Sequence, residues 1–249
     1  MTAILITVTE EKGYRARSWN KARIECIGNN IRTWINDIPV AYVVDDVTAK
    51  GFIALQVHSI GKKEDEGRQI RWKNIRIRTN GLTPAPLDNT FVVNLIPNTI
   101  SPAEKMNGVS LLFDGKSTNG WRGAYKESFP TKGWEIKDGV LSVQPSGGGE
   151  STNGGDIVTT SEYSAFVLQF DFRLTRGANS GVKYFVTEME QNTGSAIGLE
   201  YQVLDDENHP DAKLGSIGNR TLAALYDLIP AVHERRARKP IGEWNRGMI

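Results

Sequence analysis

Apolar and polar residues alternate with a period of two along much of this chain, a pattern that predicts β-strands rather than helices. The clearest alternation occurs at residues 52–58, 166–173, 182–185 and 199–203. Helical periodicity is scarce, and Gly, Asn and Asp punctuate the short apolar-polar runs. Many short strands with regular turn signals predict an all-β protein, either a sandwich or a barrel.

Turn residues divide the chain into strands. Asn29-Asn30 after Gly28 predicts a turn between strands 23–27 and 31–35, and Asn36-Asp37 predicts the turn before strand 40–44. Two further strands are expected at 51–58 and 70–78. Later in the chain, Asp138-Gly139 predicts a tight hairpin between 134–137 and 140–141.

The polar faces of the four alternating segments carry side chains suited to fixed contacts with a ligand. Their candidate site residues are Gln56, His58, Asp171, Arg173, Lys183, Glu200 and Gln202. If the segments pair in one sheet, these side chains line one surface. The pattern favours a ligand groove, although the plain wet side of an antiparallel sheet is the alternative reading.

The order of segments indicates two incomplete copies of one domain. Arg17-Ser18-Trp19-Asn20 near the start is similar to Gly242-Glu243-Trp244-Asn245 near the end. We therefore expect the C-terminal part of one domain at 1–78 and the N-terminal part of a second at 109–249. The stretch 79–108 holds four of the ten prolines and is predicted to be a linker, although Phe91-Val92-Val93 could dock on a neighbouring element.

Composition and charge exclude several classes of protein. The chain has 249 residues, of which 39% are hydrophobic and 24% charged, and its net charge of +1 gives no support for nucleic-acid binding. No apolar run is long enough for a membrane span. The lone Cys26 excludes an internal disulfide. The apolar stretch 3–8 is too short for an export signal and is predicted to be a strand.

Seven sequence motifs stand out in the later and the early part of the chain. They are Leu112-Phe113-Asp114-Gly115-Lys116, Asp156-Ile157-Val158-Thr159-Thr160, Ala178-Asn179-Ser180-Gly181-Val182, Leu199-Glu200-Tyr201-Gln202-Val203, Leu225-Tyr226-Asp227-Leu228, Trp34-Ile35-Asn36 and Gly51-Phe52-Ile53-Ala54-Leu55-Gln56-Val57-His58. Together they resemble the 3-keto-disaccharide hydrolase domain family. The later part is similar to that family's start, and the early part is similar to its end. The resemblance covers most of residues 14–78 and 108–249.

The resemblance implies a concanavalin A-like jelly roll, a sandwich of two antiparallel sheets with a carbohydrate groove on the concave sheet. The order of the parts, back before front, departs from the family. The two parts supply about one full set of strands, so they could assemble as a circular permutant or by exchange between two chains. The alternative is a fragment of a tandem protein.

The family also implies hydrolysis of disaccharides or glycosides oxidised at C3, through removal of the C2 proton, β-elimination and hydration. Glu200 is the leading candidate for the base or acid, because a carboxylate in a partly dry groove gains basicity. Lys183 or Arg173 is expected to stabilise the enolate, and His58 to relay a proton. The expected substrate contacts are Gln202, Asp171, Arg173, Gln56 and Tyr226. Asp171 could instead pair with Arg173, and Glu200 with Lys183.

No cofactor or metal is expected. Asp205-Asp206 with Asn208 and His209 leaves a divalent-cation site as an open alternative to a loop held by Asx turns. Two other functions also stay open: a noncatalytic carbohydrate-binding module and a structural domain that self-associates through unfinished sheet edges. The resemblance implies that the full-length protein is periplasmic or secreted, although this chain carries no export signal.

Overall fold

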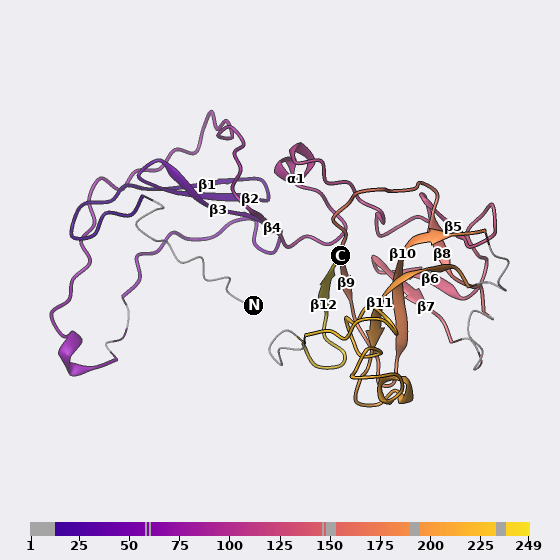
Figure 1. Cartoon of the computed structure of the whole chain (residues 1–249). Coiled ribbons are helices and arrows are strands. Elements are labelled where there is room, and N and C mark those ends of the chain that lie inside the picture. The colour runs from indigo at the N-terminus through magenta and orange to yellow at the C-terminus, as the bar shows by residue number, and fades with distance from the viewer. Residues whose placement is uncertain are drawn as a thin grey trace. The chain divides into compact units, whose positions relative to one another are not determined.

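The computed structural model describes residues 13–57, 59, 61–145, 147, 153–189, 195–232 and 238–249 (Figure 1). The predicted strand at 3–8 and the candidate residue His58 lie outside this described part. The chain divides into two compact units, Met1–Asp114 and Gly115–Ile249. Nearly all regular structure is β-strand and most pairs are antiparallel, so the all-β prediction is confirmed and agrees with a jelly-roll sandwich.

The first unit contains a four-stranded sheet in the order β1-β2-β3-β4. Its strands are β1 (Ala22–Ile27), β2 (Asn30–Ile35), β3 (Ile38–Val44) and β4 (Val92–Asn94), and its helices are the 3-10 helix η2 (Lys63–Asp65) and α1 (Pro102–Met106). The predicted turn between β2 and β3 is confirmed, with φ of 50° at Asn36 and 67° at Asp37. Left-handed angles at both central residues match the twist of a tight hairpin.

The stretch expected to be a plain linker lies against this sheet. β4 pairs in parallel with β3, and Ala103 of α1 packs with Tyr42 and Val44. The buried Arg32 guanidinium donates hydrogen bonds to the Ala85 and Pro86 carbonyls and to Asp88. Proline density signals an irregular backbone but does not predict the side chains that anchor it.

The strands predicted at 51–58 and 70–78 do not form in the described residues. Residues 51–57 and 70–78 pair with no strand among the described residues. Their apolar side chains are exposed, most of all Phe52 and Val57, at 107% and 96%. The expectation was wrong here because alternation favours a strand only where a neighbouring strand supplies hydrogen bonds.

The described residues of the second unit form four antiparallel strand pairs. These are β5 (Trp121–Gly123) with β8 (Ile157–Thr159), β6 (Trp134–Lys137) with β7 (Val140–Val143), β9 (Gln169–Phe172) with β12 (Asn245–Met248), and β10 (Asn179–Thr187) with β11 (Ile197–Leu204), accompanied by the 3-10 helix η3 (Pro210–Lys213). The predicted β6–β7 hairpin is confirmed, with φ of 51° at Asp138 and 77° at Gly139.

Aromatic packing joins two of these pairs. The Phe170 ring of β9 meets the Tyr201 ring of β11 edge-on, with centroids 5.4 Å apart. Gly247 of β12 lies beneath Phe170, where a Cβ atom would come within 2.7 Å of the ring carbon Cε2. Glycine is therefore required at this position for the close approach of ring and backbone.

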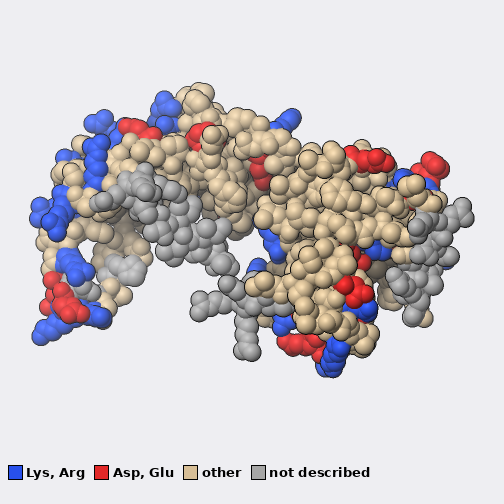
Figure 2. Space-filling model, in the orientation of Figure 1, with Lys and Arg blue, Asp and Glu red and all other residues tan. Residues whose placement is uncertain are grey.

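Charged side chains of both signs are interspersed over the face shown in Figure 2, without a continuous basic surface. This distribution agrees with the net charge of +1. Within the described residues, every helix is too short or too polar to cross a lipid bilayer.

Candidate active site

The candidate site lies on the β10–β11 ladder of the second unit. Lys183 is directly opposite Glu200, and Gly181 is directly opposite Gln202. Because these pairs are two residues apart on each strand, all four residues belong to one face of the ladder. The structure therefore places Lys183 and Glu200 together, as the alternation in the sequence required.

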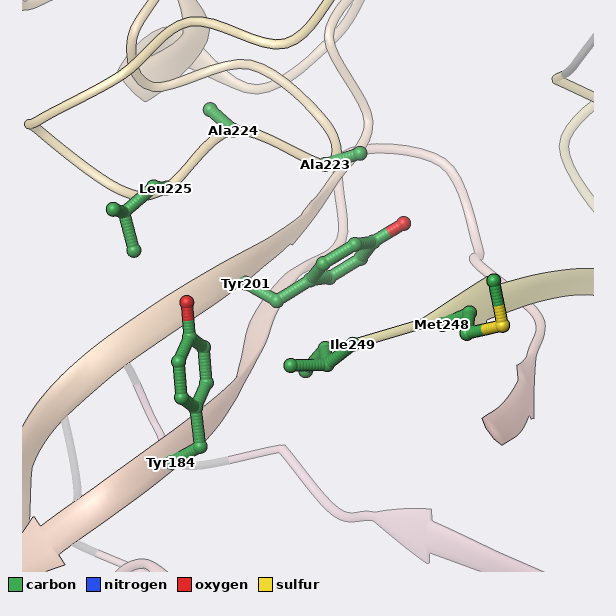
Figure 3. A pocket seen from close by; sticks show the side chains of 7 residues that line it. All are labelled: Tyr184, Tyr201, Ala223, Ala224, Leu225, Met248 and Ile249. Carbon is green, nitrogen blue, oxygen red and sulfur yellow. The ribbon is translucent and has the colours of Figure 1, made fainter. Parts of the chain in front are cut away.

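The other face of the same ladder is apolar. Tyr184 and Tyr201 project to one side of β10 and β11 and line a pocket of about 260 Å³ with Leu225, Met248 and Ile249 (Figure 3). Burial raises the pKa of the Tyr201 phenol. This pocket is the apolar side of the sheet, and the candidate site occupies the opposite, polar side.

Lys183 is held by two oxygen acceptors. Its Nζ donates to Asp156 Oδ2 at 2.9 Å and to Ser195 Oγ at 3.2 Å. The Lys183 and Asp156 side chains are 22% and 30% exposed, so the pair is largely but not fully shielded from water. The ion pair that the structure gives Lys183 is with Asp156, rather than the Glu200 pair considered as an alternative.

Glu200 leans across the neighbouring strand above Gly181. A Cβ atom at position 181 would lie 2.6 Å from Glu200 Cδ, well inside an ordinary carbon–carbon contact. The glycine therefore leaves the space that the half-buried carboxylate occupies. The Glu200 carboxylate and the Lys183 side chain thus lie on the same face of the ladder.

A loop strand closes the outer edge of β11. Tyr226 N donates to Glu200 O, while Ala223 N and Ala224 O bond the Gln202 backbone. Leu225 forms a β-bridge with Tyr201. Since Leu225 joins the apolar pocket, alternation places Tyr226 on the polar side with Glu200.

The Tyr226 ring is supported by charged neighbours. The Arg220 guanidinium lies 5.2 Å from the ring centroid and bonds both Asp227 and Asp211. Burial raises the pKa of the Tyr226 phenol, and the Asp211 carboxylate adds to the effect. The Arg220 guanidinium thereby covers one face of the Tyr226 ring.

Gln202 is buried, whereas a residue that binds a ligand must be accessible to it. Its residue exposure is only 1%, and its Oε1 accepts a hydrogen bond from Val203 N. Alternation correctly put Gln202 on the polar face, but it could not reveal how deeply this end of β11 is buried.

Asp171 and Arg173 belong to the β9–β12 region. Asp171 forms a two-point ion pair with Arg246, at 2.7 and 2.9 Å, instead of pairing with Arg173. The Arg173 guanidinium lies 4.9 Å from the Trp244 ring centroid. Both candidate residues are exposed. Gln56 is exposed in the first unit, and His58 lies outside the described residues.

Asp205, the candidate for a cation site, anchors a loop. Its buried carboxylate accepts hydrogen bonds from Gly177 N, Asn208 Nδ2 and Glu207 N. The bond from Gly177 is the main reason that the pKa of Asp205 is lowered. Among the residues that the structure describes, no group of three or more His, Cys, Asp or Glu side chains is arranged to hold a metal ion.

Sequence reasoning did not select Asp156 and Ser195 as site residues. Asp156 precedes β8 and is 27 residues from Lys183, so no local spacing connects them. The available signal was the position of Asp156 at the head of the family-like stretch 156–160.

Comparison with known proteins places this site in a family. The family described as 3-keto-alpha-glucoside-1,2-lyase-like domain matches residues 5–78 and 108–249. The chain belongs to this family. The two matched segments include the first strands of the first unit and the whole β10–β11 site.

The chain is also similar to two individual proteins. A curated 3-keto-disaccharide hydrolase of Bacteroides thetaiotaomicron is 42% identical over 154 residues, which are 57% of this chain and 52% of that protein. The chain thus spans about half the length of this relative. A crystal structure described as a candidate glycosyl hydrolase of Parabacteroides distasonis is 32% identical, covering 61% of this chain and 67% of that one, with a TM-score of 0.49.

Proposed function

We propose that this chain carries the catalytic site of an enzyme that cleaves 3-keto-glycosides, including 3-keto-disaccharides. Family membership and the name of the Bacteroides relative support a glycoside hydrolase-like activity. The observation that carries the proposal is the opposed pair of Glu200 and Lys183 on one polar face. We expect the full-length protein to act in the periplasm or outside the cell, as the resemblance implies.

The proposed reaction begins at C2 of the oxidised sugar. A ketone at C3 acidifies the C2 proton, and removal of that proton gives a C2–C3 enolate. The enolate electrons re-form the C3 carbonyl, create a C1–C2 double bond and expel the C1 oxygen. Water then adds its oxygen to C1 and a proton to C2, which completes a net hydrolysis. The "1,2-lyase" in the family description fits the elimination step.

Each step needs a group that the site contains. Glu200 takes the C2 proton and, once protonated, gives it to the departing oxygen. The Lys183 ammonium stabilises the negative charge that develops on the C3 oxygen. Tyr226 is the expected aromatic contact of the sugar ring. Asp171, Arg173 and Gln56 stay predicted substrate contacts, as His58 stays a predicted proton relay. Gln202 supports the fold beneath the site.

The direct test is turnover by Glu200→Gln with a purified 3-keto-disaccharide, such as 3-keto-trehalose, followed by liquid chromatography. We expect product formation to fall by at least about 100-fold, since an amide cannot accept the C2 proton. Binding of the substrate should be retained, because the amide keeps the size of the carboxylate.

Glu162→Gln is the matched control, since it neutralises an exposed carboxylate after β8. Unchanged turnover in Glu200→Gln would remove Glu200 from the mechanism. Saturable sugar binding by the unaltered chain without any product would instead indicate a noncatalytic carbohydrate-binding module.

We also propose that the chain self-associates through the unpaired segments 51–57 and 70–78. Their exposed apolar side chains, and the lack of a paired strand among the described residues, support this. Light scattering after size exclusion should show a mass that rises with concentration, and Ile53→Lys should shift it toward the monomer. A monomer at all concentrations would contradict the proposal.

A further inference from the structure

Asp156 connects three segments around the candidate site. It lies directly before β8, and its Oδ2 accepts hydrogen bonds from Lys183 Nζ of β10 and from Ala196 N at the entry to β11. Its backbone carbonyl accepts from Ala124 N, which continues the β5–β8 ladder. Backbone N–H groups therefore hold Asp156 both at its own carbonyl and at the carboxylate oxygen that meets the ammonium.

The geometry around Lys183 restricts where its ammonium can lie. An ammonium group has three N–H donors. Asp156 takes one at 2.9 Å and Ser195 takes a second at 3.2 Å. A long lysine side chain loses rotamer freedom when it is held in one position. Here two acceptors fixed to separate segments hold the ammonium before any substrate arrives.

This arrangement suits a group that must stabilise a developing charge. A preorganised donor is effective because it does not have to reorient as the charge forms. With two of its donors directed to Asp156 and Ser195, the Lys183 ammonium has one remaining N–H for an enolate oxygen.

We propose that Asp156, assisted by Ser195, is the positioning residue for Lys183, and that it aims the remaining N–H of the ammonium at the C3 oxygen of a 3-keto sugar. This inference rests on the proposed function for its substrate. Asp156 contacts the ammonium and the backbone, so it acts through Lys183 rather than on the sugar.

The kinetic test is a double-mutant cycle on the whole chain. Asp156→Asn keeps the side-chain shape but makes the acceptor neutral, which weakens the bond to the ammonium. We expect kcat to fall between about tenfold and a hundredfold while KM changes less than twofold. In the Lys183→Met background, Asp156→Asn should have no further effect on kcat, because its action requires the lysine. Equal effects in both backgrounds would overturn the inference.

A second measurement does not depend on turnover. Proton–nitrogen correlation spectra of lysine ammonium groups, taken at low temperature, detect an ammonium that is held and shielded from exchange. The Lys183 signal, identified by its loss in Lys183→Met, should be present in the unaltered chain and in Glu162→Gln. It should disappear or shift in Asp156→Asn, and shift in Ser195→Ala.

These two readouts separate the possible failures. An absent Lys183 signal in the unaltered chain, or an unchanged signal in Asp156→Asn, overturns the positioning role. The expected signals without any turnover of 3-keto-disaccharide would support the positioning role and reject the proposed function. Should Asp156→Asn fail to fold, the Ser195→Ala variant alone tests the proposal. An unchanged Lys183 signal in Ser195→Ala would then overturn the proposed positioning of the ammonium.

Discussion

A methyl group at position 181 should disable the site while leaving the fold intact. Gly181 has no left-handed φ, so alanine causes no backbone strain there. Its Cβ would lie 2.6 Å from Glu200 Cδ, whereas carbon atoms pack at about 3.5–4.0 Å. The carboxylate must therefore move by roughly 1 Å. A misplacement of that size can cost about 100-fold in rate.

We expect Gly181→Ala to lower kcat for 3-keto-disaccharide cleavage by about 100-fold. The free energy of unfolding in urea should change by less than about 1 kcal/mol, because the clash is with a flexible side chain. Gly61→Ala is the control, since its Cβ would have no neighbour within 4 Å. Full activity in Gly181→Ala would refute the claim that the Glu200 carboxylate works from its position above Gly181.

Three further predictions concern stability. The hydrogen bond from Arg122 lowers the pKa of Glu188 to about 2, so this pair should stabilise the fold above pH 4.5 and be lost as pH falls toward 2. Glu188→Gln should lower the free energy of unfolding in urea by about 1–2 kcal/mol at pH 7 and should change it little at pH 2. Asp205→Asn should cost about 2–3 kcal/mol in the same assay, because its buried oxygen acceptors lose their charge. Arg32→Leu should speed hydrogen exchange at the Ala85 amide by at least about tenfold, whereas unchanged exchange would show that the arginine does not anchor this segment.

The features predicted correctly from the sequence are local ones. Asp138-Gly139 and Asn36-Asp37 gave correct hairpins because both residues of each turn adopt positive φ, which these residue types tolerate. The alternation at 182–185 and 199–203 correctly placed Lys183 and Glu200 on a polar face, since that face follows from the period of a strand.

The features that were missed depend on distant partners. Strand β9 pairs with β12, so Asp171 forms an ion pair with Arg246, 75 residues away. No local spacing in the sequence predicts this pair. Asp156 reaches Lys183 only once β8 and β10 are placed.

The burial of individual side chains could not be predicted from the sequence pattern either. Gln202 and Glu200 alternate in the same way, yet only Gln202 is sealed from solvent. Residues 51–57 show the converse, since a strand pattern without a paired neighbour remains exposed. Alternation identifies two faces of a segment, but packing against other segments decides which of them is covered.

The central claim is that cleavage passes through proton removal at C2 by Glu200. The most direct measurement is the deuterium content at C2 of the 3-keto product, followed by NMR during turnover in D₂O and corrected for uncatalysed exchange. We predict that the product carries solvent deuterium at C2, and that this incorporation is lost in Glu200→Gln. A product that keeps its original proton at C2 at full turnover would contradict the account.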